Sequence, residues 1–279
     1  LGGAATMSGD PPNIIIGTSL GLTFMDFLTN TGIIILIALI AMIIYFYLCF
    51  AKKLKDGSHM ADSSAMPDPS SAISNRLGFM IITMIFLMVV FLLVTHAQTG
   101  ITVASIGIIA AVLTLVTSVD VKGGLLRSID WKTIYFFVGL FVVVGGLEQT
   151  HILDLLADLI SRASGGHVMV MVCVILWFSA LASAIIDNIP FAATMVPVIK
   201  ALAITQGIPV ETLAWTLALG TDIGGNATPI GASANVVGTS IASRNGHHIT
   251  WGQYCRYALP ATILCLVICT VMLYILHVR

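Results

Sequence analysis

Long apolar stretches alternate with short polar interruptions along the whole chain. Residues 77–95 and 101–119 contain no Asp, Glu, Lys or Arg, and each can cross the roughly 30 Å hydrocarbon core of a bilayer as a helix. Residues 33–50 and 257–277 are similar, and an amphipathic stretch lies at 151–163. The pattern predicts an all-α, polytopic membrane protein.

Two glycine-rich polar segments interrupt this pattern and look like copies of each other. Residues 2–13 and 224–235 are offset by 222 positions, and six of their twelve positions are identical. The shared residues are two leading glycines, an alanine, a threonine, a further glycine and an asparagine. A duplicated helix-breaking segment is typical of a transporter built from repeats, with its site near the bilayer midplane.

A third interruption, Asp187-Asn188-Ile189-Pro190, lies inside the apolar run that begins at His167. An ionisable residue there costs several kcal/mol unless it faces a cavity or a partner, so Asp187 and Asn188 are candidate site residues. Pro190 removes a backbone donor, which frees carbonyl groups for a cation, while the following half-helix offers N–H groups to an anion. The alternative is a kinked helix that contains a hydrogen-bonded Asp–Asn pair.

The second glycine-rich segment carries neutral polar groups. Its glycines permit the backbone to unwind and to approach a ligand closely. The side chains that suit a dehydrated Na⁺ or an oxyanion are Asn226, Thr228, Ser233 and Asn235. Thr228-Pro229 fits a helix cap followed by a first helical position. Close packing of membrane helices is the alternative explanation for the small residues.

The first segment predicts the start of a helix. Asp10 fits an N-cap with Pro11 at the first helical position, and this half-helix is expected to extend to about Phe27. Asp10 and Asp222 therefore have two open interpretations, a direct role at the site or the capping of a half-helix.

The basic residues predict the orientation in the membrane. Nine of the twelve lie in residues 51–76, 120–133 and 244–256, which are expected in the cytoplasm. Residues 51–76 are also rich in Ser, Asp and Pro, which indicates a linker. Alternation of the spans then requires an odd number of crossings between 148 and 243. One crossing at about 211–243 satisfies this if 167–204 is a re-entrant hairpin with Asp187–Pro190 at its tip.

Composition narrows the class of function. The chain is 58% hydrophobic and 9% charged, and its mean hydropathy is +1.03. A net charge of −1 gives no basis for binding nucleic acid, and the five cysteines contain no C-x-x-C pair, so they are expected to be packing residues. No Walker A motif is present, and Met7-Ser8-Gly9-Asp10 lacks the Gly-x-Gly-Asp motif of intramembrane aspartyl proteases. We therefore expect no enzyme and no cofactor other than a coupling Na⁺ or H⁺, with a small ion and the lipid bilayer as partners.

Three segments together resemble the signature segments of the ArsB/NhaD permease group. These are residues 9–17 (GDPPNIIIG), 183–191 (SAIIDNIPF) and 231–238 (GASANVVG). Within that group the chain is most similar to the P-protein and citrate-transporter-like branch of the ion transporter superfamily. The resemblance implies two inverted repeats, each with a re-entrant hairpin and a broken helix, and transport of small ions by alternating access. A homodimer is also the family's expectation.

The resemblance also implies a site, carried over by position. The residues of the second repeat are Asp187, Asn188, Asn226, Thr228, Ser233 and Asn235, and those of the first are Thr6, Asp10 and Asn13. A bound Na⁺ is expected at Asp187, Asn188, Asn226 and Thr228.

The chain departs from the two-repeat pattern at its start. With the offset of 222, the first-repeat equivalents of Trp131 and Asp187 fall near positions −91 and −35. We therefore expect a C-terminal portion with a truncated first repeat. Its predicted parts are residues 1–50, the linker 51–76 and a second repeat at 77–279.

Four hypotheses about the function remain open at this point. The leading hypothesis is a secondary transporter of a small inorganic ion or organic anion, of arsenite or citrate type, coupled to H⁺ or Na⁺. The alternatives are a Na⁺/H⁺ antiporter, a non-transporting fragment and, least supported, an aspartyl protease.

Overall fold

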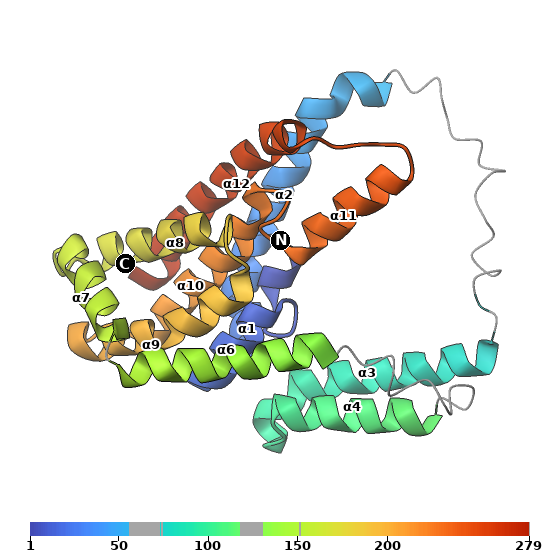
Figure 1. Ribbon diagram of the computed structural model, residues 1–279, viewed down its shortest axis with the longest axis horizontal. Helices are drawn as coiled ribbons and strands as arrows, with labels where there is room; N and C mark the ends of the chain where they lie inside the picture. The colour runs from blue at the N-terminus through green and yellow to red at the C-terminus, as the bar shows by residue number, and fades with distance from the viewer. Residues whose placement is uncertain (56–72, 74, 118–130, 151, 279) are drawn as a thin grey trace. The chain divides into compact units, whose positions relative to one another are not determined.

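The computed structural model describes residues 1–55, 73, 75–117, 131–150 and 152–278, and within these ranges it contains helices and no strand (Figure 1). The predicted all-α class is confirmed. The described chain forms two compact units, one made of Leu1–Tyr45 and Phe136–Arg279, the other of Phe46–Tyr135. We call them unit 1 and unit 2. The predicted linker is outside the described residues at 56–72 and 74, as is most of the predicted loop 120–133.

Unit 2 is dominated by a helical hairpin. Helices α3 (Arg76–Thr99) and α4 (Val103–Thr117) pack against each other after a turn at Gly100, where φ is +69°. No residue of α3 is buried, although the helix is apolar throughout. Apolar side chains around the whole circumference of an unburied helix indicate contact with lipid.

The first two helices of unit 1 correct a predicted boundary. Helix α1 (Pro11–Leu20) ends before Gly21, which has a φ of +71° and donates to the Gly17 carbonyl. Helix α2 (Phe24–Lys55) begins soon afterwards, because the Thr23 N–H donates to Asp26 Oδ2 at 2.7 Å and the Asp26 N–H donates to Thr23 Oγ1 at 3.2 Å. The sequence predicted a half-helix that extends to Phe27 and a span that starts at residue 33. Both boundaries are wrong, because α1 already ends at Leu20 and α2 begins at Phe24.

Helix α10 (Val210–Gly224) is the core of unit 1, and every residue from Thr212 to Gly224 is buried. The helices that pack on it are α1, α8 (Val168–Ser183), α9 (Asn188–Gln206) and α12 (Trp251–Leu273). A Cβ at Gly220 or Gly224 would collide with the α8 backbone at Leu176 or Ala180. Small residues thus let α8 and α10 approach closely, as the packing interpretation of these glycines expects.

Two breaks interrupt the helices of unit 1. Residues 184–187 separate α8 from α9, at the interruption that the sequence predicts. Helix α10 passes into a short 3₁₀ turn, η5 (Gly225–Ala227), and the chain becomes helical again in α11 (Ser233–Arg244). A similar 3₁₀ turn, η1 (Gly2–Ala5), precedes α1.

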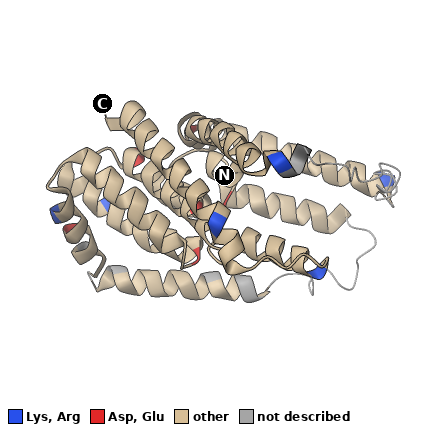
Figure 2. Cartoon of the chain, turned by 90° about the horizontal axis from the view of Figure 1, so that it is seen from above, with Lys and Arg blue, Asp and Glu red and all other residues tan. Residues whose placement is uncertain are grey.

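The remaining helices of unit 1 are α6 (Trp131–Gln149), which begins in unit 2, and the short amphipathic α7 (Ile152–Ser164). In α7, Leu153 and Ile160 are buried while Leu155 is exposed. Among the described residues, four helices are long and apolar enough to cross a membrane: Phe24–Lys52, Arg76–Thr99, Asn188–Gln206 and Trp251–Val278. Charged side chains are sparse along the helices in Figure 2.

Candidate functional site

The two glycine-rich segments have the same backbone path; we call residues 2–13 the first loop and 224–235 the second loop. Each begins with a 3₁₀ turn that ends at an extended threonine, with φ and ψ of −140° and 156° at Thr6 and −128° and 159° at Thr228. Each then passes through a second extended residue, with −144° and 144° at Asp10 and −145° and 145° at Ala232. A helix starts at the next residue in both. The duplication seen in the sequence is therefore a duplication of structure.

An asparagine holds the first loop together. The Asn13 amide nitrogen donates to the carbonyl oxygens of Gly3 and Thr6, each at 3.2 Å. The Asn13 side chain is fully buried. Each of these carbonyls already accepts one backbone N–H, from Thr6 for Gly3 and from Gly9 for Thr6, and the Asn13 amide adds a second donor that ties the start of α1 to the turn.

The equivalent asparagine holds the second loop. Asn235 donates to the carbonyl oxygens of Gly225 at 3.0 Å and Thr228 at 3.1 Å. Acceptors ten and seven residues before the asparagine are used in both loops. Asn13, Asn235, Thr6 and Thr228, which the sequence nominates as binding residues, thus contribute to the loop framework.

In each loop, two glycines allow two backbone segments to pass each other in close contact, and we call this contact the glycine crossing. A Cβ on Gly9 would overlap the Gly3 backbone, and a Cβ on Gly231 would lie 2.5 Å from the Gly225 carbonyl oxygen. Any larger residue would push apart the two backbone segments that meet at the glycine crossing. Both pairs of glycines are identical between the loops because the crossing needs them.

Asp10 distinguishes the first loop from the second, where Ala232 is its counterpart. Asp10 occupies the N-cap position of α1, but its side chain makes no capping hydrogen bond. It instead accepts a hydrogen bond at 3.1 Å from the Asn188 amide, at the start of α9. The capping interpretation of the Asp10 side chain is wrong, because Pro11 and Pro12 have no N–H and the Asn13 N–H donates to the backbone carbonyl of Asp10.

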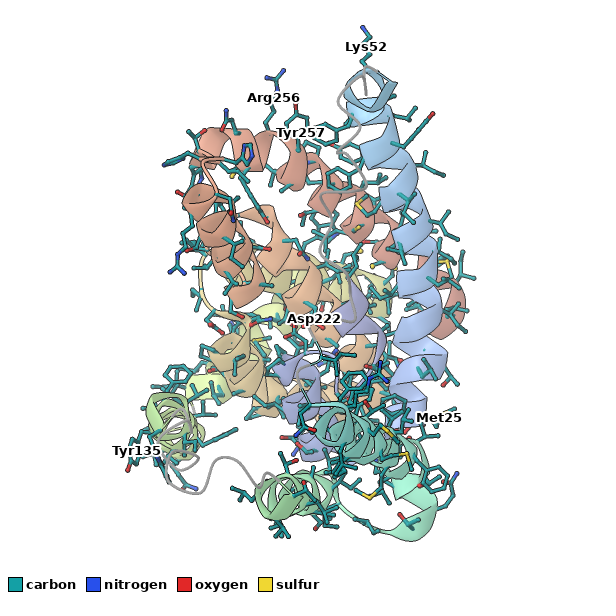
Figure 3. All side chains as sticks on the ribbon, turned by 90° about the vertical axis from the view of Figure 1, so that its right-hand side faces the viewer. Met25, Lys52, Tyr135, Asp222, Arg256 and Tyr257 are labelled. Carbon is teal, nitrogen blue, oxygen red and sulfur yellow. The ribbon has the colours of Figure 1, made fainter. Side chains whose placement is uncertain are left out.

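Asp222, near the end of α10, is a residue that the predicted site omits. Its side chain is 8% exposed, and it is the only charged residue among the buried residues of the described chain. Its nearest interacting side chains are Asp10 and Asn13, and Figure 3 places it among the helices of unit 1. Neither of its carboxylate oxygens accepts a hydrogen bond. Its position as an acidic residue inside an apolar helix is the sequence signal that favours adding Asp222 to the predicted site residues.

The second loop is tied to the helix break instead of to a carboxylate. The Thr228 hydroxyl donates to the carbonyl of Ala184, which directly follows α8. Asn226 donates to the carbonyls of Asp222 at 3.0 Å and Ile223 at 3.1 Å. The predicted start of a helix at Thr228-Pro229 is wrong, because residues 229–230 form a turn and α11 begins only at Ser233, whose side chain is exposed.

The residues predicted to bind Na⁺ each make other contacts in the structure. Asp187 is exposed, and its Oδ1 accepts from the Ile189 N–H at 2.9 Å, so it caps α9. Asn188 contacts Asp10, while Asn226 and Thr228 bond to backbone carbonyls. No hydrogen bond between Asp187 and Asn188 is observed in the described structure, so the alternative of a bonded Asp–Asn pair is not supported. The described residues contain no cluster of three or more His, Cys, Asp or Glu that could hold a metal ion.

Comparison with known proteins identifies the family. Residues 1–220 match the citrate transporter family, CitMHS. The chain belongs to this family. It is 37% identical, over 99% of its length, to an uncharacterized transporter of Mycobacterium tuberculosis. A 46 kDa membrane protein of Mycobacterium leprae is 34% identical over 99% of the chain.

Two further relationships bear on its place in the family. The human P protein is 37% identical over 54% of this chain, which corresponds to 19% of the P protein. The chain spans 64% of the length of the M. tuberculosis relative and 65% of that of the M. leprae protein. With its apolar helices, this family membership makes the chain part of an integral, multi-pass membrane protein of a transporter family.

Proposed function

We propose that this transporter moves a small organic anion of the carboxylate class, coupled to a cation, H⁺ or Na⁺, by alternating access. The observation that carries the proposal is the contrast between two loops of equal backbone geometry. The first has a carboxylate where the second has a methyl group, at Asp10 and Ala232. Equivalent positions with opposite chemistry suit a transporter that binds ions of opposite charge.

The second loop suits an anion. The first intrahelical hydrogen bonds of α11 are donated by the N–H groups of Asn235 and Val236. The N–H groups of Ser233 and Ala234 come before these bonds and have no acceptor within the helix. Such N–H groups, together with the helix dipole, attract negative charge. The exposed Ser233 hydroxyl adds a further donor, and Ala232 brings no repelling charge.

The first loop suits a cation. Helix α1 begins with Pro11 and Pro12, which have no N–H to donate, so the donors that α11 offers are missing at this end. Asp10 and the buried Asp222 supply negative charge there instead. An anion is repelled at this loop, whereas a cation is attracted.

The family description supports citrate as the first substrate to test. The partial match to the P protein supports placement in the P-protein-like branch. Arsenite, the substrate that the resemblance to the ArsB/NhaD group implies, is the second to test. The paired loops support a two-repeat architecture, although this chain covers less than two thirds of the relatives' length.

Uptake into proteoliposomes tests the proposal. The full-length protein is reconstituted, and entry of labelled citrate, succinate and arsenite is followed with an inward H⁺ gradient, an inward Na⁺ gradient or neither. We expect accumulation of a carboxylate with one of the two gradients and little without them. Absence of gradient-dependent uptake of every substrate would overturn the proposal.

The second candidate is a Na⁺/H⁺ antiporter. It is favoured by one observation, that Asp222 is the only buried charged residue in the described structure and no buried Lys or Arg accompanies it. The same vesicles separate the two functions. An antiporter exchanges Na⁺ for H⁺ without any organic anion, whereas an anion transporter moves H⁺ or Na⁺ only when its anion is present.

We also propose that residues 51–76, 120–133 and 244–256 face the cytoplasm, because they carry most of the basic residues. A cysteine introduced at Ser243 or Asn245, both exposed, should react with a membrane-impermeant thiol reagent only in inside-out vesicles. Labelling in right-side-out vesicles would contradict this orientation.

A further inference from the structure

Three acceptor atoms beside the first loop have no donor. They are both carboxylate oxygens of Asp222 and the side-chain oxygen of Asn13. Asn13 is 0% exposed and Asp222 is 8% exposed, so bulk water does not satisfy them. Leaving a buried acceptor without a partner costs about 1–3 kcal/mol, and more when it is charged.

These acceptors belong to side chains that interact, because Asp222 on α10 lies close to Asp10 and Asn13 at the start of α1, and these two helices pack together. The Asn13 amide nitrogen is committed to the carbonyls of Gly3 and Thr6, so it is not free to turn toward Asp222. The carboxyl groups of Asp222 and Asp10 are themselves within hydrogen-bonding reach. Two carboxylates cannot bond to each other, because both only accept. One proton placed between them supplies the missing donor.

The cost of burying two negative charges side by side also indicates one proton shared by the pair. Two carboxylates in contact at a buried site cannot both remain ionised at low cost, whereas one charge shared with one proton is a known arrangement. Asn188 donates to Asp10, which favours Asp10 as the ionised member of the pair. Asp222 receives no such bond and is the member that carries the proton.

The surroundings contain few other charges. Beside the pair itself, the charged side chain that acts on it is Asp187, from the start of α9. Helix α8 presents the Ser183 hydroxyl to the α10 carbonyl of Thr221, and α12 presents the Tyr254 hydroxyl to the carbonyl of Asn226. No charged group faces the pair from α8, α10 or α12 in the described structure.

We propose that Asp222 is the binding site for the coupling ion, that this ion is a proton, and that Asp222 shares it with Asp10. The inference rests on the proposed function and specifies its coupling ion. When the site is open to one side of the membrane, the Asp222 carboxylate takes up a proton from the aqueous phase. It becomes a carboxylic acid whose O–H donates to Asp10. When the site opens to the opposite side of the membrane, the O–H bond breaks, the proton returns to the aqueous phase, and Asp222 regains its negative charge.

Infrared spectroscopy of the full-length protein in lipid tests the site without relying on transport. The wild-type protein should show the carbonyl band of a protonated carboxylic acid at neutral pH, and this band should shift in D₂O. Asp222→Asn should abolish it. Asp158→Asn, which changes an exposed carboxylate on α7, should leave it unchanged. If Asp222→Asn does not fold, Asp10→Asn should shift the band, because it replaces the partner that accepts the O–H.

Uptake by the same proteins tests the coupling. Accumulation driven by a pH gradient should fall at least tenfold in Asp222→Asn and stay at the wild-type level in Asp158→Asn. A protein that transports with Na⁺ alone, is indifferent to pH and shows no acid band would overturn the proton site while the proposed function stands. An Asp222-dependent acid band in a protein that transports nothing would support the proton site and remove the proposed function.

Discussion

Asn13 and Asn235 occupy equivalent positions 222 residues apart and make equivalent pairs of hydrogen bonds. Each amide nitrogen donates to the carbonyls of the residues ten and seven positions earlier, at 3.2 and 3.2 Å for Asn13 and 3.0 and 3.1 Å for Asn235. Two separate chain segments thus reach one backbone form through the same side chain. The loops are a shared framework, and the differences between them carry the chemistry.

Removing either asparagine should destabilise the protein. Asn13→Ala or Asn235→Ala removes both side-chain hydrogen bonds that tie the helix start to the 3₁₀ turn, which costs about 2 kcal/mol of unfolding free energy. Asn245→Ala is the control, because Asn245 is exposed and donates only to Ile241 in its own helix. Thermal unfolding in detergent measures all three. Equal stability of Asn235→Ala and Asn245→Ala would show that the loop bonds contribute nothing.

The glycine crossings should tolerate no side chain. Gly231→Ala places a Cβ 2.5 Å from the Gly225 carbonyl oxygen, so the second loop must open. Gly238→Ala, seven residues later in α11, meets nothing within 4 Å and should stabilise that helix by up to about 1 kcal/mol. The two substitutions are chemically identical and should change the unfolding temperature in opposite directions. A rise in both would mean that the crossing is not needed.

The Thr228 hydroxyl should couple the second loop to the helix break. Thr228→Val removes its hydrogen bond to Ala184 with little change in volume, which should cost about 1 kcal/mol and slow uptake. Thr228→Ser should restore both. Thr205→Val is the control, since that exposed hydroxyl bonds only within α9. Uptake rates unaffected by Thr228→Val would separate this contact from transport.

Periodicity and composition were enough to predict much of the fold. The hairpin of α3 and α4, the amphipathic α7 and the interruption near Asp187 all follow from where polar residues interrupt apolar runs. The end of α1 was missed because it depends on one glycine with positive φ and a reciprocal pair of bonds between Thr23 and Asp26. Such local caps change a helix boundary without changing the hydrophobic pattern.

The site was predictable only in part. The duplicated motif identified Asp10, Asn13 and Asn235, but not that the asparagines serve the backbone. The contact between Asn188 and Asp10 joins residues 178 positions apart, and no sequence pattern specifies that pairing. Asp187 was favoured as an ionisable residue in an apolar run that a proline breaks three residues later, whereas capping of a half-helix stayed open for Asp222. In the structure Asp187 caps a helix at the surface, whereas Asp222 is buried.

A negative charge at the start of α11 tests the central claim, that the second loop binds the transported anion, most directly. Ser233→Asp places a carboxylate at a helix N-terminus, where it should keep or raise stability by about 0.5 kcal/mol. Ser243→Asp, at an exposed position near the other end of α11, is the control. The measurement is uptake of labelled citrate into proteoliposomes under an inward pH gradient. We predict at least a tenfold loss in Ser233→Asp with unchanged unfolding temperature, and uptake within twofold of wild type in Ser243→Asp. Wild-type uptake by Ser233→Asp would contradict the account.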